Sequence, residues 1–350
     1  MRVKNVSGTI RERRTIRRFS DMPVEQETIV SVLNEAAGLY EAEGTPHWRC
    51  LYAGTPESRD ELAECMIAKV KGSTLAKLLP SKMTVLLKKQ IMNTPAHILF
   101  IAEAAETQQQ RDVNYAAVCS IMQNVQLLGW EQGLGMLWYT DPIILSESLY
   151  KKIGLREGER FAGILEIGYF DKAPKGRKRT PAERSWTIIG EEGSLLADST
   201  LPAPQSVQKL LNEAVWAPND GLREPWRFVY VTGGEVARQL SSAEEQALLP
   251  LLLVVATEEA DPHKQQEDYA AVCCLVQNFQ LLAKSEAWRV RRHIPEWVYE
   301  RERCKALGLR PLERIVAVLE LGGDKSGPES RALPPEVRIE LNSFVKTGPL

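Results

Sequence analysis

The sequence has little of what several classes of protein require. Its 350 residues include six cysteines and four histidines, and no cysteine lies in a CxxC pair or in a Cys/His spacing typical of zinc ligands. We therefore expect buried free thiols in a reducing compartment, with no disulfide framework and no structural metal. The formal net charge of -2 lacks the basic excess of a general nucleic-acid binder.

Long apolar runs are missing as well. The longest, residues 247–256, contains Pro250 and is far too short to span a bilayer. The N-terminal residues MRVKNVSGTIRERR have no apolar stretch of the kind that a secretory signal needs. The hydrophobic fraction of 44% can still fill the cores of two domains, which is a natural number at this length. We expect a cytoplasmic protein that binds neither membrane nor nucleic acid.

What the sequence does contain is a repeat of itself. The tetrapeptide Leu-Asn-Glu-Ala at 33–36 returns at 211–214, and Trp48-Arg49 returns as Trp226-Arg227. Both pairs are 178 positions apart. Self-similarity at a fixed offset is the signature of a repeated structural unit.

A second, longer match lies further along the chain. When residues 115–168 are aligned with 269–322, 19 of the 54 positions are identical, whereas composition alone would give about 3. This offset is smaller because the first copy carries an extra segment near residues 66–92. The sequence therefore predicts a tandem duplication, with one unit at 1–185 and the other at 186–350.

Both copies show the same pattern of helices and strands. Apolar residues recur at helical spacing within 25–38 and 111–132, while 97–101 and 161–169 read as buried strands. Helices and strands that do not alternate strictly favour an α+β fold, in which each copy packs helices on a mixed sheet. The segment 171–206 is rich in Pro, Gly and charge, and we expect it to run across the partner copy.

An arginine segment, residues 11–18, opens the first copy. It holds Arg11, Arg13, Arg14, Arg17 and Arg18 around Thr15. Guanidinium groups match phosphate oxygens two at a time, so the segment is a candidate phosphate site. The alternative is a solvated basic surface, which is the usual fate of a charge run. The second copy has Glu191, Glu192, Gly193 and Leu195 at the positions that match 13, 14, 15 and 17.

A second basic cluster, residues 175–179, is also confined to the first copy. It contains Arg177 and Arg179, and the matching stretch of the second copy, 323–329, is not basic. Two basic clusters in only one copy of a duplicated chain indicate a single anion site.

Residues 216–228 form a candidate binding loop in the second copy. Pro218, Asn219 and Asp220 break regular structure and expose backbone amides between flanking aromatic residues, so the loop could wrap a planar polar ring. A plain connection between a helix and a strand is the alternative. In the first copy only the Trp-Arg end of this loop is kept.

Residues 133–142 form a third candidate. Gly135 permits close backbone approach, and Trp138 and Thr140 point the same way on a short extended segment. The second copy has arginine in place of both Gly135 and Trp138, at Arg289 and Arg292. A Gly-x-Gly pair alone is a weak signal, so a packing role is the default interpretation.

Taken together, these motifs resemble the nitroreductase family of FMN-dependent oxidoreductases. The matching stretches are ERRTIRRF, LNEAVWAPNDGLREPWRFVYV, YAAVCSIMQNVQLLGWEQGLGMLWYT, and FAGILEIGYF followed by PKGRKRTP. Members of the family are homodimers with two FMN sites at the interface, each built from the arginines and tail of one subunit and the Pro-rich loop of the other. The resemblance implies a fused pseudo-dimer, in which 1–185 carries the phosphate-binding arginines and 186–350 is a degenerate unit that supplies the partner loop.

The resemblance also implies roles for particular residues. The FMN phosphate and ribityl chain would be held by Arg13, Arg14, Thr15 and Arg17, with help from Arg177 and Arg179. The edge of the flavin ring near N5 would lie beside Trp138, Thr140 and Asp141. Pro218, Asn219 and Asp220 would come from the second copy. The chain departs from the family at Thr15 (usually Ser), Asp141 (often Gly) and Leu222 (often Asn).

One flavin per chain is the expected number. The mirror-image site would need arginines from the second copy and the loop from the first copy, and neither copy keeps the required motif. A fused chain of this kind can act as a monomer. The implied reaction is ping-pong: NAD(P)H gives up hydride and an electron-poor acceptor, such as a nitroaromatic, quinone or enone, takes the electrons. No Ser-His-Asp, Cys-His or paired-carboxylate set demands other chemistry, and we assign no catalytic acid.

Three alternatives to this function stay open. One is a specialised flavin dehydrogenase or tailoring oxidase that does not use NAD(P)H, and another is a flavin-holding protein without turnover. A nucleic-acid role for the arginines would instead appear as a salt-sensitive interaction with polyanions.

Overall fold

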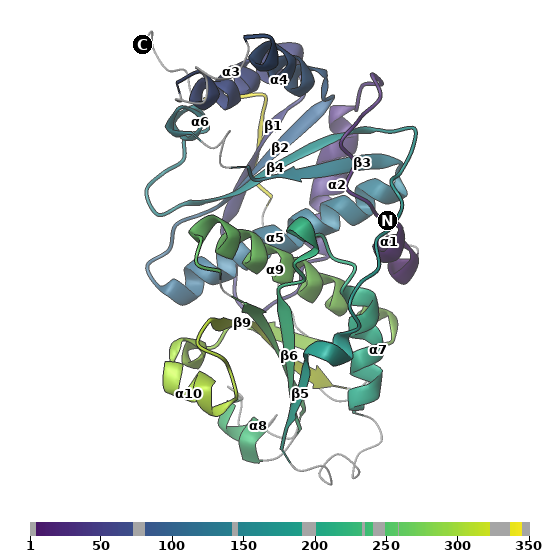
Figure 1. The fold of residues 1–350 in the computed structure, drawn as a ribbon, viewed down its shortest axis with the longest axis vertical. Helices are drawn as coiled ribbons and strands as arrows, with labels where there is room; N and C mark the ends of the chain where they lie inside the picture. The colour runs from purple at the N-terminus through teal and green to yellow at the C-terminus, as the bar shows by residue number, and fades with distance from the viewer. Residues whose placement is uncertain are drawn as a thin grey trace. The chain divides into compact units, whose positions relative to one another are not determined.

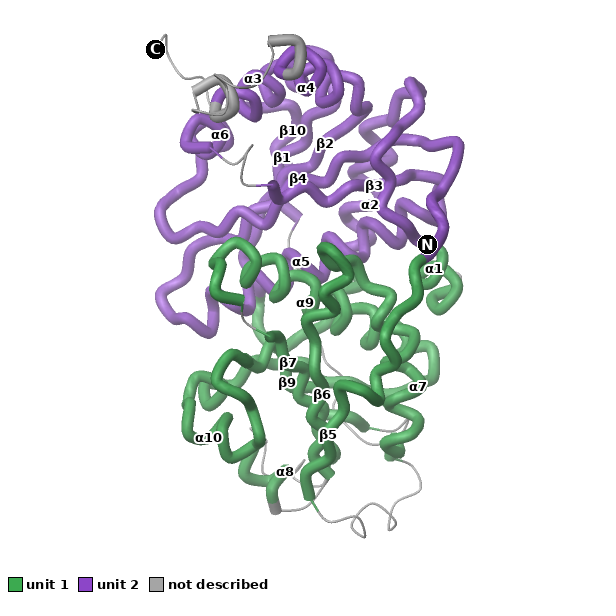
Figure 2. Tube along the Cα trace, viewed as in Figure 1, with its two compact units in different colours: residues 1–12, 38–45, 177–334 green, residues 13–37, 46–176, 335–350 purple. Residues whose placement is uncertain are grey.

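The computed structural model describes residues 5–72, 81–141, 146–190, 201–232, 235–240, 249–257, 259–322 and 337–344. The chain forms two compact units, and each of them combines segments from both copies of the repeat (Figure 2). Unit 1 consists of residues 1–12, 38–45 and 177–334, and unit 2 of residues 13–37, 46–176 and 335–350. The repeat boundaries 1–185 and 186–350 describe the sequence, and they stay a prediction.

Unit 2 is built on a five-stranded mixed sheet (Figure 1). Its strand order is β10 (Ile339–Leu341), β1 (Trp48–Ala53), β2 (Ala96–Ala102), β4 (Arg160–Tyr169) and β3 (Leu134–Tyr139). Strand β10 runs parallel to β1, and the other neighbours are antiparallel. Its helices are α2 (Gln26–Gly38), α3 (Pro56–Gly72), α4 (Ser81–Asn93), α5 (Gln108–Glu131) and α6 (Glu147–Lys152).

Helix α5 is the central helix of unit 2. Its first turn is capped by the Thr107 hydroxyl, which accepts from the backbone N–H of Gln110 at 3.1 Å. Every residue from Asp112 to Gly129 except Val113 is buried, so α5 is covered around its whole circumference rather than along one stripe. The extra segment of the first copy forms the end of α3 and nearly all of α4, and these two helices and α6 cover an apolar cluster on the sheet.

Unit 1 repeats this sheet. Its order is β5 (Trp186–Ile189), β6 (Trp226–Val231), β7 (Leu251–Thr257), β9 (Glu313–Gly322) and β8 (Arg289–His293). Here β5 runs parallel to β6 and the other pairs are antiparallel. The helices are α1 (Val6–Glu12), α7 (Pro204–Ala214), α8 (Glu235–Leu240), α9 (Pro262–Ser285) and α10 (Arg301–Ala306), with short 3-10 turns η2 (Ala182–Ser185), η4 (Asp220–Leu222) and η6 (Glu296–Tyr299).

Matching residues of the two copies make matching contacts. Arg49 donates to the Glu159 carboxylate at 2.9 Å in unit 2, and Arg227 donates to Glu313 at 2.7 Å in unit 1. The asparagines of α5 and α9, Asn124 and Asn278, donate to carbonyls at the ends of α2 and α7, at 2.9 and 3.1 Å. Buried ion pairs and the hydrogen bonds of buried asparagine side chains depend on close packing. Their recurrence therefore supports a common origin for the two units.

Each sheet takes one edge strand from the segment that follows the closing strand of the other sheet, because β5 follows β4 and β10 follows β9. Strand β5 follows the tail of the first copy and pairs with β6 of the second. Strand β10 ends the second copy and pairs with β1 of the first. The predicted path of 171–206 across the partner copy is confirmed for residues 186–189, while residues 191–200 lie outside the described part of the chain.

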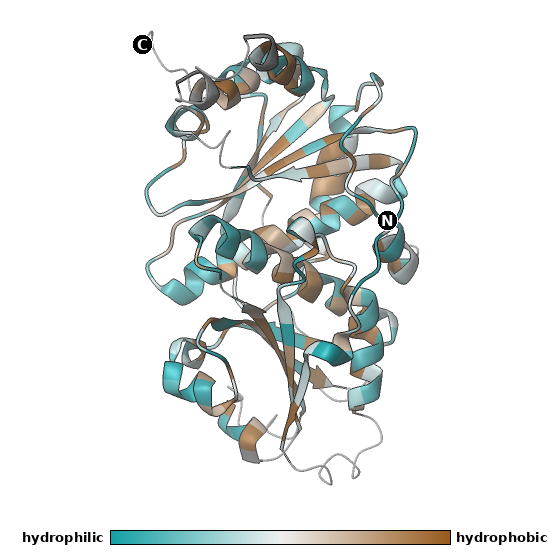
Figure 3. Cartoon of the chain, viewed as in Figure 1, coloured by the Kyte–Doolittle hydropathy of each residue, from teal (hydrophilic) through white to brown (hydrophobic). Residues whose placement is uncertain are grey.

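Hydrophobic residues concentrate on the strands of both sheets, as Figure 3 shows. The predicted α+β class is confirmed, with two mixed sheets flanked by helices. Within the described ranges, none of the helices combines the length and the apolar character that crossing a membrane would require.

Candidate functional site

The arginine segment is divided between the two units. Helix α1 ends at Glu12, so Arg11 belongs to unit 1 and residues 13–18 belong to unit 2. In unit 2 this part of the segment lies along β3, where the Ile16 N–H donates to the Met136 carbonyl at 3.0 Å and Thr15 forms a parallel bridge with Met136. A Cβ at Gly135 would collide with the Ile16 side chain. The close approach predicted at Gly135 is therefore made by the arginine segment itself.

The arginines of unit 2 differ in exposure. Arg13 is buried and donates to the Gln126 side chain of α5 at 3.4 Å. Arg14 is half-buried, donates to the Arg13 carbonyl at 2.8 Å, and lies so close to Gly176 that a side chain there would overlap its guanidinium. Arg17 is exposed. These contacts hold Arg13 inside the unit and place Arg14 against the basic cluster 175–179, called the basic tail below. Arg17 stays open to an anion.

The end of β3 carries the other predicted residues of unit 2. Trp138 is half-buried, and its indole N–H donates to the Ala162 carbonyl at 3.0 Å. Thr140 is half-buried and Asp141 is exposed just beyond the strand. Burial, with the negative charges of Asp141 and Glu166 nearby, raises the pKa of Tyr139 to about 12. The last residue of the predicted segment, Pro142, lies outside the described part of the chain.

In unit 1 the basic tail meets the start of the candidate loop. The Arg179 guanidinium donates to the Val215 carbonyl at 3.1 Å and lies 5.4 Å from the ring centroid of Trp216. Arg11 lies 5.9 Å from the same ring and forms an ion pair with Glu213. Two guanidiniums thus gather at one aromatic ring, a cation–π arrangement. Arg177 is exposed on the same tail.

The sequence argument did not assign Glu213 or Trp216 to this cluster. Glu213 lies three residues before the candidate loop and Trp216 is its first residue, and an acid one helical turn from a tryptophan could have suggested partners for nearby arginines.

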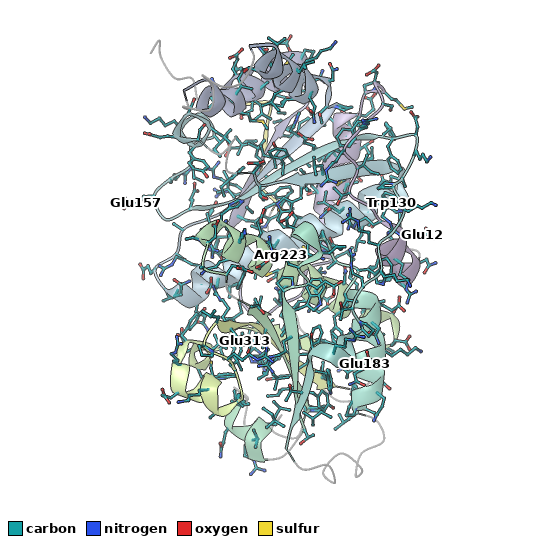
Figure 4. The ribbon with its side chains drawn as sticks, viewed as in Figure 1. Glu12, Trp130, Glu157, Glu183, Arg223 and Glu313 are labelled. Carbon is teal, nitrogen blue, oxygen red and sulfur yellow. The ribbon has the colours of Figure 1, made fainter. Side chains whose placement is uncertain are left out.

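The candidate loop is held by its own side chains. Asn219 donates to the Ala217 carbonyl at 3.3 Å, and its side-chain oxygen accepts from the Glu224 N–H at 3.2 Å. Asp220 receives a bond from Arg223 at 2.8 Å. Figure 4 labels Arg223 among the side chains of the chain. Leu222 and Glu224 have positive φ angles of 59° and 50°. Backbone strain of this kind is retained only where the surroundings enforce it, and it often marks a functional loop.

The second copy has a different arrangement at the positions that match Trp138 and its neighbours. Here the loop 38–45 from the first copy is fastened to α9 and β8 of unit 1. Gln280 donates to the Glu41 carbonyl at 2.8 Å, and Arg291 donates to the Glu43 carboxylate at 2.9 and 3.0 Å. Arg292, at the position of Trp138, is buried with its guanidinium 5.5 Å from the Tyr40 ring.

The counterparts of the two basic clusters, residues 191–195 and 323–329 of the second copy, lie outside the described part of the chain.

The residues gathered in unit 2 suit an anion with an attached flat ring. Three guanidiniums and one hydroxyl occupy positions 13–17, and all are hydrogen-bond donors of the kind that phosphate oxygens accept. They run beside β3, whose far end presents the Trp138 ring. The donor chemistry thus fits a phosphorylated aromatic cofactor.

Comparison with known proteins identifies the family of the chain. The sequence profile of the Nitroreductase family matches residues 10–169. YfhC of Bacillus subtilis (strain 168), named as a candidate NAD(P)H nitroreductase, is 34% identical over 182 residues, which are 51% of this chain and 91% of YfhC.

Two solved structures are also similar. A nitroreductase-like family protein from Bacillus cereus is 34% identical, with 54% of this chain and 97% of that chain covered and a TM-score of 0.48. An FMN-dependent nitroreductase from Clostridium difficile R20291 is 23% identical, with 49% and 91% covered and a TM-score of 0.35. The likeness to YfhC, which extends over nearly all of that protein, shows that this chain belongs to the nitroreductase family.

Proposed function

We propose that this chain is an FMN-dependent oxidoreductase that passes hydride from NAD(P)H to an electron-poor small molecule such as a nitroaromatic, a quinone or an enone. Family membership makes it an oxidoreductase. The observation that carries the finer proposal is the run of donors at 13–17, held along β3 by the bond from Ile16 to Met136. When bound, FMN supplies the ring that accepts a hydride and gives it up again.

Residues of unit 2 would hold the cofactor in two groups. Arg13, Arg14 and Arg17 supply permanent positive charge for the phosphate, and the Thr15 hydroxyl adds a neutral donor. Arg13 is fixed by Gln126, so it needs little ordering on binding. The ring end would lie against Trp138, Thr140 and Asp141, where the half-buried indole shields the ring from water.

The predicted contribution of unit 1 stays a prediction. It comprises Arg177, Arg179, Pro218, Asn219 and Asp220. Within unit 1, the bond from Arg179 to Val215 brings the basic tail to the residues just before Pro218. The tail and the loop are therefore neighbours, as residues that act on one ligand must be.

One FMN per chain is part of the proposal, as are the tandem duplication and the packing of the two copies as a pseudo-dimer. The single FMN site is supported by two observations. Arg292 of the second copy takes the place of Trp138, and the loop 38–45 of the first copy is bound to Gln280 and Arg291. A buried guanidinium cannot offer the flat apolar surface that an indole gives. A monomeric, cytoplasmic protein remains the expectation from sequence.

The test is to purify the protein, release and count its flavin, and measure NADH and NADPH oxidation with a nitroaromatic and a quinone. We expect about one FMN per chain and turnover that shows ping-pong kinetics. No flavin after reconstitution with FMN would overturn the proposal, and two per chain would overturn the asymmetry. Bound flavin that NAD(P)H leaves oxidised would instead favour a dehydrogenase or oxidase with another electron donor.

A further inference from the structure

A β-bulge in β4 lies beside the Trp138 side chain. Along the pairing of β2 with β4, Phe100 pairs with Gly163 but Ile101 pairs with Phe161, so Ala162 is an extra residue in β4. The carbonyl of this extra residue accepts the indole N–H of Trp138 at 3.0 Å. The bulge therefore fixes the indole by a directed bond.

Gly163 allows the indole to lie there. Its φ angle is +133°, in a region that residues with a side chain rarely adopt. A Cβ at this position would overlap the indole nitrogen of Trp138 and would lie 3.1 Å from the Tyr139 carbonyl oxygen. Both the backbone conformation and the space exclude other residues while Trp138 keeps this position.

The second copy shows that the bulge itself does not need glycine. In unit 1, Val254 pairs with Ala317 and Val255 pairs with Ile315, so β9 has its extra residue at the same place. Alanine occupies the position of Gly163, and this described residue has no positive φ. Arg292 occupies the position of Trp138. Glycine is thus found where the tryptophan is found, and the fold tolerates alanine where it is not.

We propose that Gly163 is a positioning residue for the cofactor site: by leaving room for the Trp138 indole against the bulge, it fixes the surface that meets the flavin ring. The inference rests on the proposed function, in which Trp138 contacts the ring. Trp138 is half-buried, so part of its surface stays available for that contact. A single hydrogen bond and a close-packed backbone together allow the indole little rotation.

The experiment compares four variants with the wild type: Gly163→Ala, Trp138→Leu, the double variant, and Ala317→Gly as the matched control. The measurements are FMN affinity by fluorescence titration, the visible band of the bound flavin, and near-ultraviolet circular dichroism of the flavin-free protein. We expect Gly163→Ala to weaken FMN binding about tenfold, which corresponds to about 1.4 kcal/mol, and to change the flavin band and the tryptophan dichroism. The double variant should bind no more weakly than Trp138→Leu, because the two changes act through one contact.

Several outcomes would overturn the inference. These are unchanged FMN affinity and band in a folded Gly163→Ala protein, fully additive losses in the double variant, or an equal effect of Ala317→Gly. If Gly163→Ala does not fold, a folded double variant supports a clash with the indole, and an unfolded one contradicts it. If the wild type binds no FMN, the proposed function fails, while unchanged dichroism in Gly163→Ala would refute the positioning role separately.

Discussion

Glu166 is a buried acid whose stability cost can be measured. It lies on β4, is 3% exposed, and pairs across the sheet with His97 on β2. One carboxylate oxygen is 4.0 Å from the His97 Nε2, too far for a hydrogen bond. Burial raises the pKa of Glu166 from 4.5 to about 7. Burial also lowers the pKa of His97 to about 3, with Arg59 adding to the effect, so His97 stays neutral where Glu166 titrates.

The sign of the pH dependence follows from these values. Between pH 4.5 and 7 the folded chain keeps a proton that the unfolded chain has released, so stability falls as pH rises through this window. Above pH 7 the cost is complete, and the shift from 4.5 to about 7 corresponds to about 3 kcal/mol. Glu166→Gln keeps the shape and cannot ionise. We expect it to raise the melting temperature by about 5–10 °C at pH 8 and to change it little at pH 4.

Glu320 provides the matched control, because it holds the same place on β9. It is 2% exposed and pairs with Arg291 at 3.0 Å. Glu320→Gln should destabilise the protein at pH 8, because it removes one partner of a largely buried ion pair. Thermal melts followed by circular dichroism at pH 4, 6 and 8 test both variants. The reasoning is refuted if Glu166→Gln lowers the melting temperature at pH 8, or if the two variants shift it in the same direction.

Three further predictions concern the candidate site and its counterpart. Arg17→Ala should weaken FMN binding about tenfold, since charge-assisted bonds contribute about 1.5–3 kcal/mol, whereas Arg18→Ala should change the titration little. Leu222→Gly should stabilise the protein by about 1 kcal/mol, because glycine relieves the φ angle of 59°; chemical denaturation measures this, and a loss of stability would contradict the strain argument. Glu43→Gln should free the loop 38–45 from Arg291 and hasten its cleavage by protease without changing the flavin count; unchanged cleavage would show that the ion pair does not hold the loop.

The helices and strands followed from the sequence because their signals are local. The helical period of 111–132 predicted α5, which runs from Gln108 to Glu131, and the apolar run 97–101 predicted β2, which runs from Ala96 to Ala102. The ends differ by a few residues because caps such as Thr107 set them, and a cap does not alter the apolar pattern.

The assignment of segments to units could not be predicted in the same way. The arginine segment reads as one basic run, but it divides after Glu12, and Arg11 pairs with Glu213, which is 202 residues away. Likewise, the sequence showed only that the loop 38–45 lacks the motif of the candidate loop, and it did not indicate the bonds to Gln280 and Arg291. Such partners are chosen by long-range packing, which local periodicity does not encode.

The edge strand β10 has a consequence for how the protein is made. Residues 339–341 lie near the end of the chain, yet they pair with β1, which the ribosome produces almost three hundred residues earlier. Asn342 adds bonds to the Tyr52 carbonyl and the Gly54 N–H, at 2.7 and 2.8 Å. Until residues 339–341 have been synthesised, the outer side of β1 therefore stays without this neighbour, as an unpaired edge that invites aggregation. Growth of the nascent chain, rather than closure of its first sheet, sets the earliest moment at which that edge can be covered.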